Sequence, residues 1–372
     1  MSQPDVIVVG GGLVGAACAQ QLAIRQISVR ILESGSEEGV ASAAAAGMLA
    51  PLAESAPENP LLSLSVRGRD LYHELAPALK EETGIDIGLW NEGILQLALS
   101  TGEAARLTHE IAWQRQRGFK LDWLSPDDLH DRYPGLTPEA VGGKLAPEDG
   151  GLEPEALLKA FLASAKRHGA ELSRGVRVEE VVVENSTAVG VKADGKTISA
   201  GAVVLAAGAW SGGIGGLPRP LSVEPIRGQM LAVNWPADEP RAIVYAQSGY
   251  VMYRNGEALA GTTMEYAGFD AVSTIEGIER VQEIMGTIYP ALAGAETKRR
   301  WAGLRPGSPD GNPFVGQDAD VEALWYATGH GRNGVLLAGI TGEIIAQLFV
   351  GAPIEYDIAP IDPRRFWQIT RR

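Results

Sequence analysis

VIVVGGGLVG at residues 6–15, followed by helix-compatible residues and then by SVRILES at residues 28–34, decides the fold. The pattern predicts a strand, a tight glycine turn, a helix and a second strand. Gly10 permits the sharp turn, Gly12 lets the backbone approach a pyrophosphate, and Gly15 lets the helix pack close to the first strand. The sequence therefore predicts a dinucleotide site in which amides at the helix N-terminus face the phosphates.

An acidic residue, Glu33, ends the second strand and bears on which nucleotide binds. A carboxylate at this position accepts hydrogen bonds from ribose hydroxyls and disfavours the 2'-phosphate of NADP. A lone glycine pattern also marks ordinary turns, but the flanking strand, helix and acid make this prediction specific. The stretch by itself leaves NAD and FAD both open.

The composition excludes several classes of function. The chain has 372 residues, of which 45% are hydrophobic, so it can bury a large core and is expected to form two or three domains. Its 32 basic and 46 acidic residues give a net charge of −14, which disfavours nucleic acid and anionic lipid as partners. Cys18 is the only cysteine, so it is expected to be a small buried side chain rather than half of a disulfide. The five histidines lack metal-ligand spacing, and no metal site is expected.

The sequence carries no pattern that predicts secretion or membrane insertion. No basic region precedes an apolar core at the N-terminus. The apolar stretch at residues 335–350 is interrupted by Glu343 and is short for a bilayer span. We therefore expect a cytoplasmic protein without membrane insertion. The oligomeric state stays open, and a homo-oligomer is possible.

The run ASAAAAGMLAPLAE at residues 41–54 has two interpretations. Its alanines favour a helix. Gly47 and Pro51 interrupt such a helix, however, and small side chains would also let a flat ligand lie against the backbone. We favour the ligand contact.

The remaining patterns predict an α/β protein with two structural units. Helices are expected at residues 61–82, 103–117, 154–168, 274–289 and 335–350, with a short one capped by Ser125. Strands are expected at residues 90–99, 176–183, 188–193, 202–211 and 323–329 and in four segments between 228 and 261, whereas residues 303–316 are expected to form a loop. We expect a Rossmann-like nucleotide-binding domain at residues 1–82, 146–225 and 300–372, with an inserted antiparallel-sheet substrate domain at 83–145 and 226–299.

Two segments near the C-terminus carry candidate binding groups. The helix expected to begin at residues 333–336 offers free amides to an anion, or to a ring that gains negative charge, such as reduced flavin. An ordinary strand-to-helix crossover is the alternative. Arg305, in the expected loop, and Arg332, in the turn before that helix, each carry a guanidinium that can bind a carboxylate through two hydrogen bonds. A surface or structural salt bridge is the alternative for either arginine.

Several motifs together resemble those of the glycine oxidase branch of the D-amino-acid oxidase flavoproteins. They are VIVVGGGLVG at residues 6–15, ASAAAAGML at 41–49, LAAGAWS at 205–211, PIRGQM at 225–230, GLRPGSPDGNPFVG at 303–316 and GHGRNGVLLAGITGE at 329–343. The resemblance runs nearly from end to end. The combination of AAAGML with GHxRNGxLL distinguishes glycine oxidases from most of their relatives.

The resemblance implies FAD rather than NAD, held extended with its pyrophosphate at the first glycine turn. The implied cofactor-binding residues are Gly10, Gly12, Leu13, Val14, Gly15, Glu33 at the adenosine ribose, Ser34, Ser42, Ala45, Gly47, Met48, Leu49, Val178 at the adenine, Gly208, Trp210, Arg332, Asn333, Gly334, Val335 and Leu336. Arg305 would clamp the substrate carboxylate with help from Tyr250. Met264 would wall the pocket, and Arg332 would lie near the flavin edge.

Two departures from the family pattern affect the expected site. Gly331 occupies a position that is commonly aromatic in relatives, so the pocket is expected to be wider or the flavin edge more exposed. Relatives that tether flavin covalently use a C-terminal cysteine, whereas Cys18 is the only cysteine here. The resemblance therefore implies noncovalent FAD.

The implied reaction is oxidation of glycine or another small amine-bearing acid, small D-amino acids included. Hydride would pass from Cα of the neutral amine to flavin N5, O2 would reoxidise the flavin to give H2O2, and the imine would hydrolyse to glyoxylate and ammonia. In the family, the imine can instead supply the thiazole of thiamine. Two alternatives remain: a D-amino-acid or D-hydroxyproline dehydrogenase that passes electrons to a quinone or carrier, and a non-catalytic FAD-binding subunit.

Overall fold

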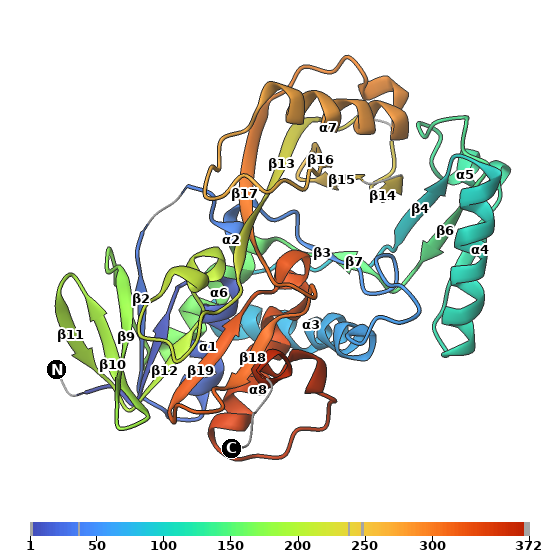
Figure 1. Ribbon diagram of the computed structural model, residues 1–372. Helices are drawn as coiled ribbons and strands as arrows, with labels where there is room; N and C mark the ends of the chain where they lie inside the picture. Colours follow the sequence, from blue (N-terminus) through green and yellow to red (C-terminus); the bar gives the residue numbers. More distant parts are fainter. Residues whose placement is uncertain (1–2, 36–37, 237–238, 247–248, 368–372) are drawn as a thin grey trace.

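The computed structural model describes residues 3–35, 38–236, 239–246 and 249–367. These residues form two large sheets, one of six strands at the lower left of Figure 1 and one of eight strands across its upper part. The first is a mostly parallel sheet with helices packed on it, and the second is mostly antiparallel. This arrangement confirms the predicted α/β fold with a second, antiparallel sheet.

The six-stranded sheet has the order β18-β19-β12-β1-β2-β8 and is parallel except for the pair of β18 and β19. Its strands are β1 (Val6–Val9), β2 (Val29–Glu33), β8 (Glu171–Arg174), β12 (Ala202–Leu205), β18 (Phe314–Gln317) and β19 (Leu324–Thr328). Helices α1 (Leu13–Ile24), α3 (Leu62–Thr83), α6 (Pro154–Arg167) and α8 (Gly334–Phe349) share a hydrophobic core with it. A three-stranded sheet of β9 (Val178–Glu184), β10 (Thr187–Ala193) and β11 (Lys196–Ser199) lies beyond it at the far left of Figure 1.

The apolar run of β1 follows from burial on both of its faces. Val6 and Val8 pack into the core that holds the helices, whereas Ile7 and Val9 pack into a second core shared with β9 and β10. Alternate residues of a strand point to opposite faces, so a strand covered on both sides needs a continuous apolar sequence.

The eight-stranded sheet has the order β17-β13-β16-β15-β14-β4-β6-β5, in which only β14 and β4 pair in parallel. Its strands are β4 (Ile94–Ala98), β5 (Asp122–Leu124), β6 (Gly142–Ala146), β13 (Glu224–Asn234), β14 (Ile243–Ala246), β15 (Gly249–Arg254), β16 (Glu257–Gly261) and β17 (Arg299–Gly307). Helices α4 (Thr101–Gln116), α5 (Pro126–Arg132) and α7 (Ile275–Ile288) pack against it. Between the two sheets lie α2 (Ala41–Ala44) and the short pair of β3 (Met48–Leu49) with β7 (Gly150–Gly151).

Local signals in the sequence set several helix boundaries. Ser125 caps α5 and forms a reciprocal pair with Asp128, in which each side chain accepts a hydrogen bond from the other residue's amide. Thr274 caps α7 by accepting a hydrogen bond from the amide of Gly277 at 3.1 Å. The predicted helices at residues 61–82 and 335–350 correspond to α3 and α8 within one residue at each end.

The prediction of a loop throughout residues 303–316 is wrong. Residues through Gly307 belong to β17, which pairs with β13 over nine successive residue pairs. Glycines suggested a loop, but here they allow close packing: a Cβ at Gly303 would lie 2.4 Å from Cβ of Ala44. Pro306 is tolerated because β17 is an edge strand of the sheet.

The division of the chain into two domains remains a prediction, and β17 shifts one of its boundaries. This strand begins at Arg299 and belongs to the eight-stranded sheet. The predicted boundary at residue 300 thus falls within a strand of the eight-stranded sheet, and the next strand of the six-stranded sheet is β18, which begins at Phe314.

We expect Gly15→Ala to destabilise the protein. A Cβ at Gly15 would lie 2.0 Å from the carbonyl oxygen of Gly10, so α1 would have to move away from β1. Overpacking of this kind costs about 1–3 kcal/mol. Unfolding in urea would measure the loss. Gly294→Ala is the control because a Cβ there would meet nothing within 4 Å, and equal stability of the two variants would contradict the packing role of Gly15.

Candidate functional site

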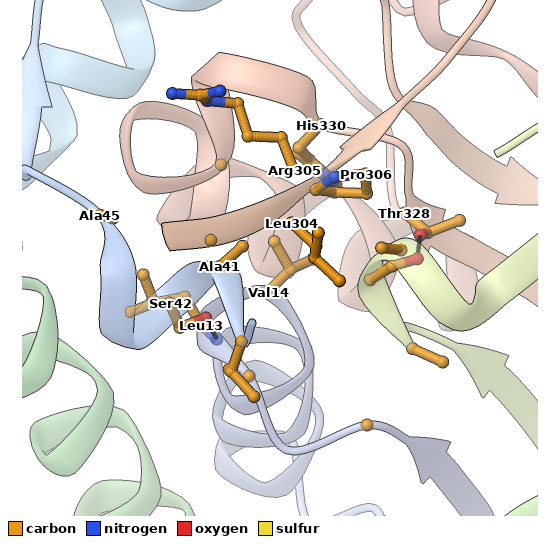
Figure 2. A pocket seen from close by; sticks show the side chains of 18 of the residues that line it. Leu13, Val14, Ala41, Ser42, Ala45, Leu304, Arg305, Pro306, Thr328 and His330 are labelled. Carbon is orange, nitrogen blue, oxygen red and sulfur yellow. Dashed lines mark hydrogen bonds between the residues drawn. The ribbon is translucent and has the colours of Figure 1, made fainter. Parts of the chain in front are cut away.

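A large cavity of 1090 Å³ lies between the two sheets. Its walls come from the turn after β1, the end of β2, the segment around α2, the segment after β12, strand β17 and the start of α8. Figure 2 shows Ala41 and Ser42 of α2, the adjoining Ala45, and Leu13 and Val14 of α1 on the side opposite Arg305 and Pro306 of β17. Elements of both sheets line the cavity, and its volume exceeds that of most small-ligand pockets.

The turn after β1 exposes backbone to the cavity. Gly10 has φ +104°, a conformation that favours glycine, and a Cβ there would lie 2.4 Å from the carbonyl oxygen of Ala206. The amide of Leu13, in the first turn of α1, donates to Oγ of Ser42 at 3.0 Å. Gly12 also lines the cavity, so backbone without a side chain at a helix N-terminus faces the space where an anion would lie.

Glu33 is held in one position at the end of β2. Its Oε2 accepts a hydrogen bond from the amide of Gly11 at 2.6 Å, and its Oε1 accepts one from the amide of Gly35 at 3.1 Å. The side chain lines the cavity next to Ser34 and Val178. A fixed carboxylate beside an apolar strand end suits a ribose with an attached base.

Trp210 and Phe269 close another part of the wall. Their rings stack with centroids 5.8 Å apart. Trp210 belongs to the 3-10 helix Gly208–Gly213 after β12, whereas Phe269 belongs to the segment after β16. Elements of both sheets therefore meet over the cavity.

Arg305 is a partly buried cation at the end of the cavity nearest the eight-stranded sheet. Its Nη2 donates to Oγ1 of Thr262 at 2.8 Å and its Nη1 to the carbonyl oxygen of Thr263 at 3.2 Å. Burial lowers the pKa of Arg305 below its usual value. Gly228 makes room for it, because a Cβ there would lie 2.2 Å from both Nη atoms. Within the described residues, no carboxylate forms a salt bridge with Arg305.

Two tyrosines lie beside this cation. Tyr250 and Tyr245 are paired across β15 and β14, with ring centroids 5.5 Å apart. Burial raises the pKa of Tyr250 to about 12, although the positive charge of Arg305 acts in the opposite direction. The phenol of Tyr250 therefore stays protonated at neutral pH and can donate a hydrogen bond.

Arg332 forms a salt bridge across the same region. Its Nη2 donates to Oε1 of Glu54 at 2.7 Å, and the Tyr245 hydroxyl donates to the same oxygen at 2.7 Å. The negative charge of Glu54 raises the pKa of Arg332. Arg332 lies on the 3-10 helix Gly331–Asn333, which leads into α8.

The start of α8 also lines the cavity, from Gly334 to Leu336. The Tyr72 hydroxyl donates to the carbonyl oxygen of Val335 at 2.5 Å and thereby fixes this first turn against α3. A helix N-terminus carries a partial positive charge, so negative charge that develops in the cavity would be stabilised here.

All but three of the predicted site residues line the cavity. Gly15 lies beneath the turn, where its role is packing. Leu49 does not line the cavity, because it alternates with Met48 in β3 and its side chain is fully buried in the helical core. Met264 does not line it either: Met264 is 53% exposed, whereas its neighbour Thr263 is buried and accepts a hydrogen bond from the amide of Gln229.

Many lining residues escaped the sequence prediction. Among them are Glu54, Gly228, Thr262, Phe269 and His330. Glu54 ends the alanine-rich run, and Gly228 and His330 belong to motifs already noted, so a signal was present for these three. Thr262 and Phe269 stand in no such motif, and only the pairing of β16 with β13 and β15 brings their segment to the cavity.

Neither a metal site nor a membrane span was found in the described part of the chain. No group of three or more histidine, cysteine, aspartate or glutamate side chains there could hold a metal ion. No helix in that part is both long enough and apolar enough to cross a bilayer.

The cavity suits an extended dinucleotide with a flat ring at one end. Its wall includes the glycine turn after β1, the Glu33 carboxylate and the N-terminus of α8. Small residues of α2 lie opposite Arg305. In agreement with this geometry, a sequence model of the family described as FAD dependent oxidoreductase matches residues 5–348. The chain belongs to the FAD-dependent oxidoreductase family. Membership of this family implies FAD as the cofactor.

Individual relatives agree with the family match. The glycine oxidase of Geobacillus kaustophilus (strain HTA426) is 34% identical over 365 residues, which cover 97% of both chains. The bifunctional protein ThiO/ThiG of Trichormus variabilis (strain ATCC 29413 / PCC 7937) is 34% identical over 352 residues, which cover 93% of this chain and 52% of that protein. The crystal structure of glycine oxidase from Geobacillus kaustophilus has a TM-score of 0.92 at 33% identity, over 97% of this chain and 98% of that chain. These relatives confirm the resemblance and indicate an FAD-dependent enzyme related to the amino-acid oxidases.

We expect His330 to make the protein less stable in acid. Its ring is 1% exposed, its Nε2 lies 3.0 Å from Oγ1 of Thr341, and burial lowers its pKa from 6.5 to about 3. The folded state therefore favours the neutral ring, so stability is full above pH 6.5 and is lost as the pH falls towards 3. The slope from this one residue is about 1.4 kcal/mol per pH unit.

Urea unfolding of the apoprotein at pH 7, 6 and 5 tests this expectation. His330→Gln should lose less stability than the wild type over that range, because it removes the group that must take up a proton on unfolding. His109→Gln, at an exposed position of α4, should keep the wild-type pH dependence. A wild-type slope retained by His330→Gln would contradict the assignment.

Proposed function

We propose that the protein catalyses the oxidative deamination of glycine and other small amino acids, small D-amino acids included. The observation that carries this proposal is the unpaired Arg305 guanidinium at one end of the FAD cavity. A buried cation without a carboxylate partner is costly, and a substrate carboxylate would relieve that cost. The names of relatives that are similar over nearly the whole chain support the same substrate class.

The residues along the cavity divide naturally among the parts of FAD. The turn at Gly10 and Gly12 would hold the pyrophosphate, and Glu33 would accept hydrogen bonds from the adenosine ribose. Val178 would meet the adenine. The segment at residues 42–48 and the start of α8 would hold the flavin ring. When bound, FAD accepts the hydride from the substrate Cα and passes electrons to O2, which yields H2O2.

Noncovalent binding of FAD is part of the proposal. Cys18 is fully buried in α1 within the helical core, and burial raises the pKa of its thiol to about 12. Such a thiol stays protonated and out of reach of the cavity. FAD is therefore expected to be released by denaturation or acid precipitation of the protein.

The protein's own contribution to the reaction is orientation. Arg305 and Tyr250 would bind the two carboxylate oxygens, with the phenol donating a hydrogen bond. With the carboxylate fixed, the Cα hydrogen is aimed at one point of the cavity, and this ordering lowers the entropic part of the barrier. The imine product would hydrolyse to glyoxylate and ammonia. The similarity to a bifunctional ThiO/ThiG protein supports the further proposal that the imine can supply thiamine thiazole synthesis.

Arg305→Ala should raise KM for glycine about 100-fold or more, because a buried charged hydrogen-bond donor is removed. FAD should stay bound, since Arg305 contacts the substrate rather than the dinucleotide in this proposal. Steady-state kinetics and the visible flavin spectrum measure the two effects. Arg300→Ala, at an exposed position of the same strand, should behave as the wild type. An unchanged KM in Arg305→Ala would refute the assignment of Arg305.

The oxidase and dehydrogenase alternatives differ in where electrons go. We expect one H2O2 for each glycine consumed in air, measured by a coupled peroxidase assay across small amino acids and D-proline derivatives. Turnover that depends on an added dye and yields almost no peroxide would favour the dehydrogenase. A flavin that glycine and other small amino acids fail to bleach without oxygen would favour the non-catalytic subunit.

A further inference from the structure

Glu54 has one carboxylate oxygen occupied and one free. Oε1 accepts two hydrogen bonds, from Arg332 and from the Tyr245 hydroxyl, each at 2.7 Å. Oε2 accepts no hydrogen bond from any described residue, and the side chain is 24% exposed. A carboxylate held on one side and open on the other is prepared to accept one more donor.

Glu54 borders two cavities. It lines the main cavity together with Arg305 and Tyr250, and it also lines a smaller adjoining cavity of 320 Å³. The smaller cavity has Ser55, Asn59 and Ser65 on its wall. Glu54 therefore lies where the main cavity meets a smaller one with polar side chains on its wall.

The two tyrosines tie Glu54 to Arg305. Tyr245 and Tyr250 face each other across β14 and β15, so their side chains project from the same side of the sheet. The Tyr245 hydroxyl contacts Glu54, and Tyr250 is close enough to Arg305 that the two influence each other's charge. The Glu54 carboxylate thus lies next to one ring, and the Arg305 guanidinium lies near the other. The centroids of the two rings are 5.5 Å apart.

Hydrogen bonds to distant side chains fix the backbone of the segment that precedes Glu54. The amides of Leu52 and Ala53 both donate to Oδ2 of Asp149 at 2.9 Å, and Asp149 forms a buried salt bridge with Arg69 at 3.0 Å. Lys144 donates to the carbonyl oxygen of Leu52 at 3.0 Å. These contacts fix the backbone next to Glu54, so the position of its carboxylate does not depend on the Arg332 contact alone.

We propose that Oε2 of Glu54 binds the substrate's ammonium group and thereby selects α-amino acids over carboxylic and 2-hydroxy acids of the same size. The inference rests on the proposed function, in which Arg305 takes the carboxylate. Arg305 and Glu54 then complement the two charges of a zwitterion, and Arg332 offsets the extra negative charge. A hydroxyl in place of the ammonium group would still fill the space, but it would leave Oε2 of Glu54 without a cationic donor.

The rival explanation is that Glu54 serves only to hold Arg332. Removing its charge would then disturb the site as a whole and affect all ligands alike. Binding of the ammonium group predicts a loss confined to ligands that carry an amine. Glycine and acetate form the matched pair because they differ only in the amino group.

The test compares wild-type holoenzyme with Glu54→Gln, which keeps the size of the side chain and a hydrogen-bond acceptor for Arg332. We expect KM for glycine to rise about 10-fold or more, the range for a lost charged hydrogen bond. The Kd of acetate, measured from its perturbation of the flavin spectrum, should change less than 2-fold. Glu54→Asp should retain part of the preference for glycine, and Glu92→Gln, at an exposed position, should match the wild type.

Equal changes for glycine and acetate, or no change for either, would overturn the proposal. The wild type provides a second test that needs no variant: its kcat/KM for glycine must exceed that for glycolate at least 10-fold, and equal values would also overturn it. Failure of the proposed function is distinguishable, because a wild type that oxidises neither glycine nor another small amino acid would fail the peroxide assay first.

Discussion

The antiparallel pair of β13 and β17 is the constraint on which the site depends. β17 begins in the eight-stranded sheet at Arg299 and, beyond Gly307, the chain continues into β18 of the six-stranded sheet. Within the pair, Gly228 lies opposite Gly303. Gly228 on β13 leaves space for the Arg305 guanidinium, and Gly303 on β17 leaves space for Ala44 of α2. The amide of Leu304 also donates to the carbonyl oxygen of Gly39 at 2.9 Å. Strand β17 thus fixes the position of the Arg305 guanidinium relative to the segment that contains Gly39 and Ala44.

Burial has opposite consequences for the two groups proposed to bind the substrate carboxylate. It lowers the pKa of Arg305, but an arginine keeps its proton at any physiological pH, so the cost of burial persists as an unpaired charge. Burial raises the pKa of Tyr250, which keeps the phenol a donor. Both effects favour a bound anion. The neutral contacts of Arg305 with Thr262 and Thr263 hold its direction without cancelling its charge.

The sequence predicted best those features that depend on neighbours along the chain. The glycine turn after β1, the end of β2 at Glu33 and the Ser125 cap are local patterns with a direct physical cause, and the structure has this turn, this strand end and this cap at those residues. Arg305 was found, but its strand was not, because the glycines and prolines around it satisfy packing and edge-strand constraints that arise only from pairing with β13.

Side-chain direction decides two further positions. Leu49 follows Met48 in β3, and successive side chains of a strand point to opposite faces, so Met48 lines the cavity and Leu49 does not. Met264 follows the buried Thr263 and is itself exposed. A motif resemblance carries no information about which neighbour faces inward. Which neighbour faces inward is decided by strand pairing. For Leu49 this is the pairing of β3 with β7, and for Met264 it is the pairing of Glu265 with Arg227.

Glu54 shows why the remaining part of the site required the structure. Its partners Tyr245 and Arg332 are far from it in sequence, and the backbone before it is held by Asp149, another distant residue. In sequence it is one acid at the end of an alanine-rich run. In the fold it is a cavity-lining carboxylate with one oxygen fixed by two donors and the other without a donor among the described residues. Because the fixed contacts hold that oxygen in place before substrate arrives, the entropy lost on binding an ammonium group falls mainly on the substrate, and a small ligand can then be recognised by its charges alone.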